Sequence, residues 1–172
     1  MNSDKVVSVC FILTSNRRHE TYEAILRCLK RIESKMGLNL KPLTIICDFE
    51  QAFTNAVAKE VYVFLPQTIV TGCWFHFCQL CYRNAQKLGM MKLYHDDTEL
   101  RELLRDFMDL ALLPIDRVHE GYEILKQRVT TSSHTKQLDT FVSYFENEWL
   151  NVFKPSSWSV NQSTWRTNNH AE

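Results

Sequence analysis

An aspartate stands directly after a buried apolar segment in the stretch LTIICDFEQAF, which makes Asp48 the first candidate for a chemical role. Residues 43 to 47 have the composition of a buried strand, and α/β proteins gather ligand-binding groups at the carboxyl ends of such strands. A carboxylate there offers the hard oxygen ligand that divalent metals prefer. The competing interpretation, and the commoner one for this feature alone, is an N-cap for the helical pattern at 49 to 63.

A second candidate is the cysteine–histidine segment that opens with GCWFH. Four potential zinc ligands lie within nine residues, namely Cys73, His76, Cys78 and Cys81. Their separations of three, two and three residues are cramped for one tetrahedral ion. The preferred interpretation is therefore small buried thiols and one histidine at a turn from strand to helix, and we do not expect zinc there.

A third candidate is the polar segment RTNNHAE at 166 to 172, which contains Asn168, Asn169 and Glu172. Polar residues this dense, ending in an acid, are not typical of a protein core. The alternative is a solvated chain end, where residues are usually mobile. The tryptophans Trp149, Trp158 and Trp165 are more simply explained by packing than by stacking on nucleic acid.

The elements that carry these residues follow from hydrophobic spacing. Strands are predicted at 6 to 13, 43 to 47 and 68 to 73, and helices at 19 to 36 and from 49 toward Pro66. From Trp74 onward the spacing is helical almost throughout. The order β-α-β-α-β followed by helices predicts an α/β protein of three strands with flanking helices and a long all-helical stretch.

Composition limits the function classes. The chain has 172 residues, 45% of them hydrophobic and 23% charged, as in an ordinary globular domain. Lys plus Arg equals Asp plus Glu at 20 each, so net charge gives no argument for a nucleic-acid partner. No stretch has the roughly 20 apolar residues that span a bilayer, and no secretory signal opens the chain. We expect neither secretion nor a membrane partner, and thiols without disulfides.

The order of these features resembles the MULE (Mutator-like element) transposase domain, and the resemblance extends over nearly all of the chain. The strand at 6 to 13 and the helix after it also resemble that family. The matching segments are IICDFEQAF (45 to 53), GCWFHFCQ (72 to 79), LGMMKLY (88 to 94), LALLPIDRV (110 to 118) and RTNNHAE (166 to 172).

The resemblance implies an RNase H-like core of the DDE superfamily, in which three carboxylates hold two Mg²⁺ or Mn²⁺ ions for DNA strand cleavage and transfer. Asp48 is then the second carboxylate and Glu172 the third, and Cys73 and His76 match the family's C-x-x-H element. The implied division is a partial core at 1–90, a helical insertion at 91–155, and a loop with the start of the third carboxylate's helix at 156–172. DNA at transposon ends is the implied partner, the nucleus the implied location, and a homo-oligomer stays open.

The family's first aspartate has no counterpart here, because only MNSDK precedes the strand at 6 to 13. We therefore expect a fragment of the catalytic core of a Mutator-like transposase that is inactive alone. The alternative is a host-adopted, non-catalytic protein that binds DNA or another protein. The third hypothesis is that the cysteine–histidine segment binds zinc.

Overall fold

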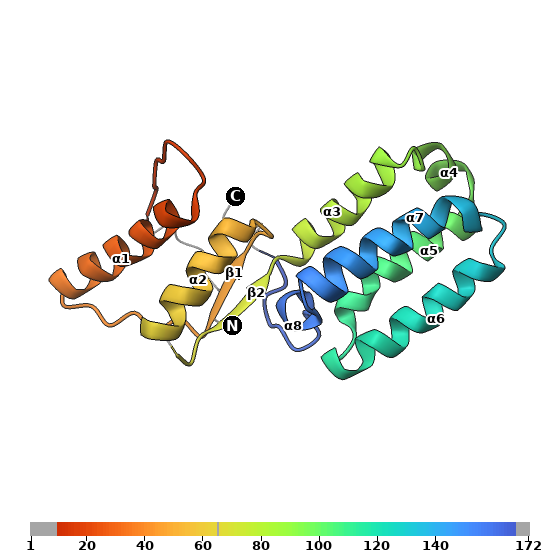
Figure 1. The fold of residues 1–172 in the computed structure, drawn as a ribbon. Coiled ribbons are helices and arrows are strands. Elements are labelled where there is room, and N and C mark those ends of the chain that lie inside the picture. The colour runs from red at the N-terminus through yellow and green to blue at the C-terminus, as the bar shows by residue number, and fades with distance from the viewer. Residues whose placement is uncertain (1–9, 65, 168–172) are drawn as a thin grey trace, which may run out of the picture. The chain divides into compact units, whose positions relative to one another are not determined.

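The computed structural model describes residues 10–64 and 66–167 (Figure 1). The chain forms two compact units, one of Met1–Thr71 with Thr167–Glu172 and one of Gly72–Arg166. Most described residues are helical, and the strands among them form a parallel sheet of two. The structure is thus mixed helix and sheet as predicted, but it does not by itself establish an RNase H-like core.

The first unit follows the predicted element order from its first helix onward. Its elements are α1 (His19–Lys35), β1 (Thr44–Cys47), α2 (Gln51–Phe64) and β2 (Ile69–Gly72), whose last residue already belongs to the second unit. The strands begin to pair where the backbone N–H of Ile69 donates to the carbonyl of Leu43 at 2.9 Å. Helix α1 ends at Lys35 with Met36 as its C-cap, and the predicted stop residue Gly37 follows with a φ of +66°, which favours a residue without a Cβ.

The predicted strand at 6 to 13 is wrong over residues 10–13, and residues 6–9 lie outside the described part of the chain. Residues 10–13 have no regular structure, and Phe11 and Leu13 are 90% and 102% exposed. A strand needs a neighbour to pair its backbone groups. Among the described residues, β1 and β2 pair with each other, and no strand lies beside residues 10–13. The prediction of three strands is therefore corrected to two for this part of the chain.

Helices α1 and α2 are joined by charged side chains. Glu23 of α1 is 7% exposed and forms ion pairs with Arg27 at 2.9 Å and Lys59 of α2 at 2.5 Å, and Nε2 of His19 lies 2.6 Å from its carboxylate. Arg27 also reaches Glu60 of α2 at 2.7 Å, and Glu60 is 5% exposed. Buried carboxylates require such partners, so this network fixes how the two helices lie against each other.

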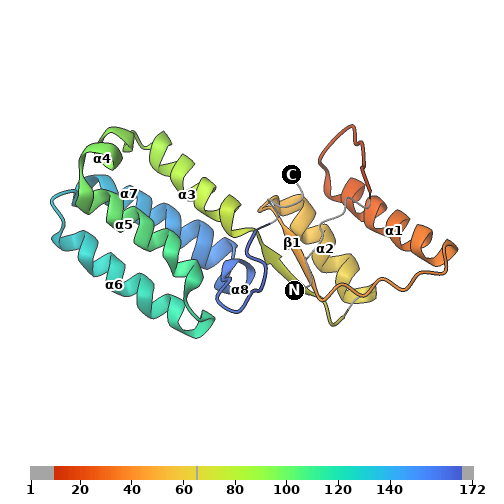
Figure 2. The ribbon, with the colours of Figure 1, turned by 180° about the vertical axis from the view of Figure 1, so that it is seen from behind.

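The second unit is a bundle of helices (Figures 1 and 2). Its α-helices are α3 (Trp74–Lys87), α4 (Met91–Asp96), α5 (Thr98–Asp109), α6 (Val118–Thr131), α7 (Thr135–Phe145) and α8 (Pro155–Trp158). Between them lie the 3-10 turns η1 (Leu110–Leu112) and η2 (Ile115–Arg117) and the π-helical segment η3 (Glu146–Val152). Short connections make consecutive long helices run in opposite directions, as both views show.

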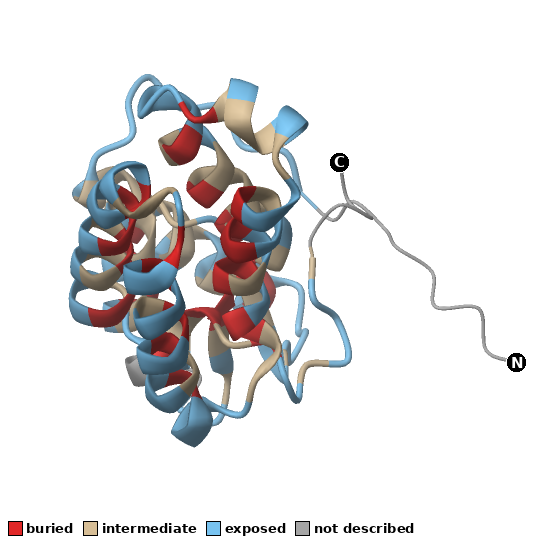
Figure 3. Cartoon of the chain, turned by 90° about the vertical axis from the view of Figure 1, so that its right-hand side faces the viewer, coloured by how far each residue is buried: buried red, intermediate tan, exposed pale blue. Residues whose placement is uncertain are grey.

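Aromatic rings form the centre of this bundle. Phe77 of α3 stacks on Trp158 at 5.0 Å and meets the edge of Trp149 at 4.6 Å, and all three side chains are fully buried. The indole N–H of Trp158 donates to the carbonyl of Trp149 at 2.7 Å. In Figure 3, buried positions alternate with exposed ones along the helices, as amphipathic helices require. The interpretation of Trp149 and Trp158 as packing residues is confirmed.

Within the described residues, no helix combines the length and apolar character needed to cross a membrane.

Candidate functional site

Asp48 follows the last residue of β1 and is exposed, as expected for a carboxylate with a chemical role at a strand end. Helix α2 begins only at Gln51, and its first turn is closed by the N–H of Thr54, which donates to the carbonyl of Glu50 at 2.9 Å. Glu50 therefore holds the N-cap position. Asp48 lies two residues before this position.

Helix α1 holds the segment that follows Asp48. The hydroxyl of Tyr22 donates to the Glu50 carboxylate at 2.8 Å, and its ring meets the edge of Phe53 at 5.1 Å. Nδ1 of His19 lies 3.3 Å from the carbonyl oxygen of Ala52. These contacts tie the first turn of α2 to α1, so the exposed Asp48 lies in a short connection between β1 and a helix start that α1 contacts.

The C-x-x-H element opens α3 in the second unit. Cys73 occupies the N-cap position, is fully buried, and makes no capping hydrogen bond through its side chain. His76 lies in the first turn and is partly buried, with its ring edge-on to Phe75 at 5.4 Å. This turn from β2 into α3 is the strand-to-helix turn that the sequence predicts.

The other cysteines of this segment are thiols in an apolar setting. Burial raises the pKa of Cys78 to about 12, with Asp109 adding to the effect. Burial also raises the pKa of Cys81 well above its ordinary value. A raised pKa disfavours the thiolate form, which is the form that zinc binds. This favours the interpretation of Cys78 and Cys81 as packing residues.

Two of the predicted motifs meet at the start of α3. The backbone N–H of Trp74, within GCWFH, donates to the carbonyl of Arg166, the first residue of RTNNHAE, at 2.9 Å. Figure 1 shows the chain returning from α8 to this point. The remaining motif residues Asn168, Asn169 and Glu172 lie outside the described residues. Convergence of Glu172 with Asp48 therefore stays a prediction.

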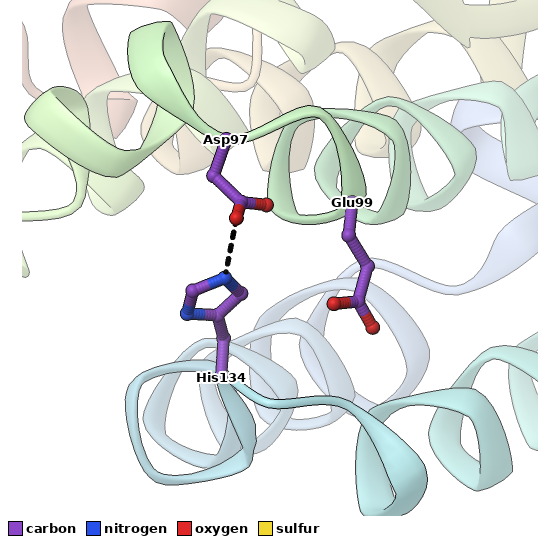
Figure 4. Close-up of side chains that lie close together, drawn as sticks. All are labelled: Asp97, Glu99 and His134. Carbon is purple, nitrogen blue, oxygen red and sulfur yellow. Dashed lines mark ion pairs between the residues drawn. The ribbon is translucent and has the colours of Figure 1, made fainter.

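One group of potential metal ligands was not predicted from the sequence. Asp97, Glu99 and His134 place one ligand atom each within 4.8 Å of one another (Figure 4). It is the one such group of three or more among the described residues. Asp97 and Glu99 lie at the start of α5, whereas His134 precedes α7. His134 lies far from Asp97 and Glu99 in the sequence, so residue spacing could not predict this group.

Comparison with known proteins addresses the first part of the chain. Residues 1–80 match the family model of the MULE transposase domain. No curated protein and no solved structure matches the chain. The recognition of this chain as a relative of the MULE transposase domain is thus confirmed over residues 1–80, which contain Asp48, Cys73 and His76.

Proposed function

We propose that this chain is part of the catalytic core of a Mutator-like DNA transposase, in which Asp48 is one of the carboxylates that bind divalent metal. The observation that carries the proposal is the position of Asp48. It is an exposed carboxylate at the carboxyl end of a strand, within the residues that match a transposase domain. A transposase-related function suggests DNA as the partner and divalent metal as the cofactor.

The residues around Asp48 fit a ligand for Mg²⁺ or Mn²⁺. These ions prefer oxygen donors and keep several waters, so a solvent-exposed carboxylate on an anchored turn suits them. In phosphodiester chemistry, such metals activate the attacking oxygen and stabilise the leaving one. The task of Asp48 is to hold a cation at a defined place, and the Tyr22–Glu50 hydrogen bond supports that placement from α1.

A single carboxylate does not complete a two-metal site. Among the described residues, no group of three potential ligands includes Asp48. Glu172 is the proposed further ligand by resemblance. We therefore propose that this chain by itself binds metal weakly at Asp48 and does not cleave DNA. We also propose, by resemblance, that it acts in the nucleus on transposon ends.

Metal binding at Asp48 is tested by adding Mn²⁺ to the ¹⁵N-labelled chain and measuring the broadening of amide signals. We expect broadening centred on the residues just after β1, and its loss in Asp48→Asn. Asp116→Asn is the matched control, because Asp116 is also an exposed aspartate, in the η2 turn of the second unit. Broadening near β1 that survives Asp48→Asn would exclude Asp48 as a ligand.

DNA cleavage is tested with the same proteins, a plasmid that carries candidate transposon ends, and Mn²⁺. We expect no nicking by the chain alone. Nicking that Asp48→Ala abolishes would show the chain to be active by itself. Stable DNA or protein binding together with no Mn²⁺ effect at Asp48 would favour the non-catalytic alternative.

A further inference from the structure

A histidine and two carboxylates from separate elements converge at one end of the helical unit (Figure 4). Asp97 ends the turn between α4 and α5, Glu99 lies in the first turn of α5, and His134 ends the turn between α6 and α7. Nε2 of His134 lies 3.0 Å from Oδ2 of Asp97. Helices α5 and α7 both start at this end of the bundle, opposite the end where α3 begins.

The carboxylates of Asp97 and Glu99 each accept a hydrogen bond, and a further bond closes the turn that carries His134. The N–H of Leu100 donates to Oδ1 of Asp97 at 2.9 Å, and Oδ2 of the same carboxylate faces Nε2 of His134. The hydroxyl of Ser133 donates to one carboxylate oxygen of Glu99, Oε2, at 3.1 Å. The hydroxyl of Ser132 accepts a hydrogen bond from the backbone N–H of His134 at 3.1 Å. These bonds order the two turns that carry the group.

The contact between His134 and Asp97 needs a proton or a cation between its two acceptor atoms. Nε2 of His134 is shielded from solvent, and Oδ2 of Asp97 lies 3.0 Å from it. Carboxylates only accept, so a neutral imidazole that turns its Nε2 lone pair toward Asp97 meets no donor. The contact is favourable with a proton on Nε2, which Oδ2 of Asp97 then accepts, or with a metal cation between the three ligand atoms.

We propose that Asp97, Glu99 and His134 form a surface binding site for a zinc-class divalent cation, separate from the metal proposed at Asp48. Imidazole nitrogen together with carboxylate oxygen suits Zn²⁺ and its neighbours, whereas Mg²⁺ prefers oxygen alone. Three protein ligands with a further position open to water are a usual zinc arrangement. The ordinary alternative is that Asp97 and His134 form only an ion pair.

The geometry needs a modest closure. Ligand atoms at a tetrahedral zinc lie roughly 3.4 Å apart, given metal–ligand distances of about 2.1 Å. The three ligand atoms lie within 4.8 Å of one another, so the distances between them would have to shorten when zinc binds. Glu99 is exposed and its carboxylate accepts one hydrogen bond, from Ser133, so its side chain can make that movement, while Asp97 and His134 already lie 3.0 Å apart. A bound cation would join the α4–α5 and α6–α7 turns and stabilise the helical unit.

The test is titration of the full chain with Zn²⁺ by calorimetry and with Co²⁺ by visible absorption. We expect one equivalent to bind and to raise the melting temperature. Glu99→Gln should weaken affinity at least about tenfold, because even changes outside the ligand set cost that much. His134→Asn should abolish binding. Glu102→Gln, an exposed glutamate on the same helix, should bind as the parent does.

Two results would overturn the proposal. One is the absence of stoichiometric binding in the parent chain, which would leave the ion pair as the explanation. The other is Co²⁺ binding with intense thiolate charge-transfer bands that persists in His134→Asn, which would locate the metal at the cysteines. Glu99 is exposed, so Glu99→Gln keeps the test valid if His134→Asn fails to fold. Neither result bears on Asp48, whose test uses Mn²⁺ and a different variant.

Discussion

The backbone N–H of Trp74 donates a hydrogen bond to the carbonyl of Arg166 at 2.9 Å, which joins the two chain ends of the helical unit. Trp74 belongs to the C-x-x-H element and Arg166 opens the segment that carries Glu172. Two motifs that lie far apart in the sequence are thus neighbours in the fold. In the proposed transposase core, this bond sets where the RTNNHAE segment leaves the bundle.

The bond between Trp74 and Arg166 predicts a specific effect of truncation on hydrogen exchange. A chain that ends at Thr167 keeps the Arg166 carbonyl, whereas one that ends at Thr164 lacks it. We expect the Trp74 amide to exchange about fivefold faster in the shorter chain, as for the loss of roughly 1 kcal/mol of hydrogen bonding. The Phe77 amide, which donates to Cys73 within α3, is the internal control and should not change. Equal exchange of Trp74 in both chains would contradict this bond.

The aromatic centre of the bundle predicts a large loss of stability on truncation of Trp158. Its ring is fully buried against Phe77, and its indole N–H donates to the carbonyls of Trp149 and Phe153. We expect Trp158→Ala to cost about 3–5 kcal/mol, because it leaves a cavity and unsatisfied acceptors. Chemical denaturation measures this cost. Ile124→Ala, at a position on α6 that is 53% exposed, should change stability by at most about 0.5 kcal/mol.

The ion pairs between α1 and α2 predict loss of stability in acid. The hydrogen bond from Lys59, aided by His19 and Arg27, holds the pKa of Glu23 below its ordinary value of 4.5. Its stabilising contribution is complete above that value and is lost as the pH falls through the lowered pKa. The free energy of unfolding of the first unit should therefore decrease from neutral to acid pH, which urea denaturation followed through α1 amide signals would measure.

A matched pair of variants isolates Glu23 in this titration. Glu23→Gln should lower stability at neutral pH and reduce the slope of stability against pH. Glu20→Gln, at an exposed acid of the same helix, should keep the slope of the parent chain. Parallel curves for the parent and Glu23→Gln would show that Glu23 does not carry the effect.

Burial of the cysteines predicts an order of thiol reactivity. Cys10 is exposed, whereas Cys73 and Cys81 are fully buried and the pKa of Cys78 is raised to about 12. Only thiolates react readily with alkylating agents. At pH 8, mass spectrometry should therefore show rapid modification of Cys10 and slow modification of Cys73, Cys78 and Cys81. All six should react in guanidinium, and early modification of Cys78 in the native chain would contradict the effect of burial.

The sequence by itself determined the elements with local signals. The helix at 19 to 36 with its stop at Gly37, the strand before Asp48 and the helix from Trp74 were all predictable from spacing. The motif order also sufficed for the recognition of residues 1–80 as related to the MULE transposase domain. These features depend on periodicity and turn chemistry within a few residues, which a sequence contains in full.

Only the tertiary structure decided the features that need distant partners. Residues 10–13 have the composition of a strand, yet a strand requires a neighbour, which composition does not supply. Helix α2 begins after Glu50, where Tyr22 and His19 of the distant helix α1 contact its first turn. The Asp97–Glu99–His134 group arose from the antiparallel course of the bundle, which brings two remote turns together.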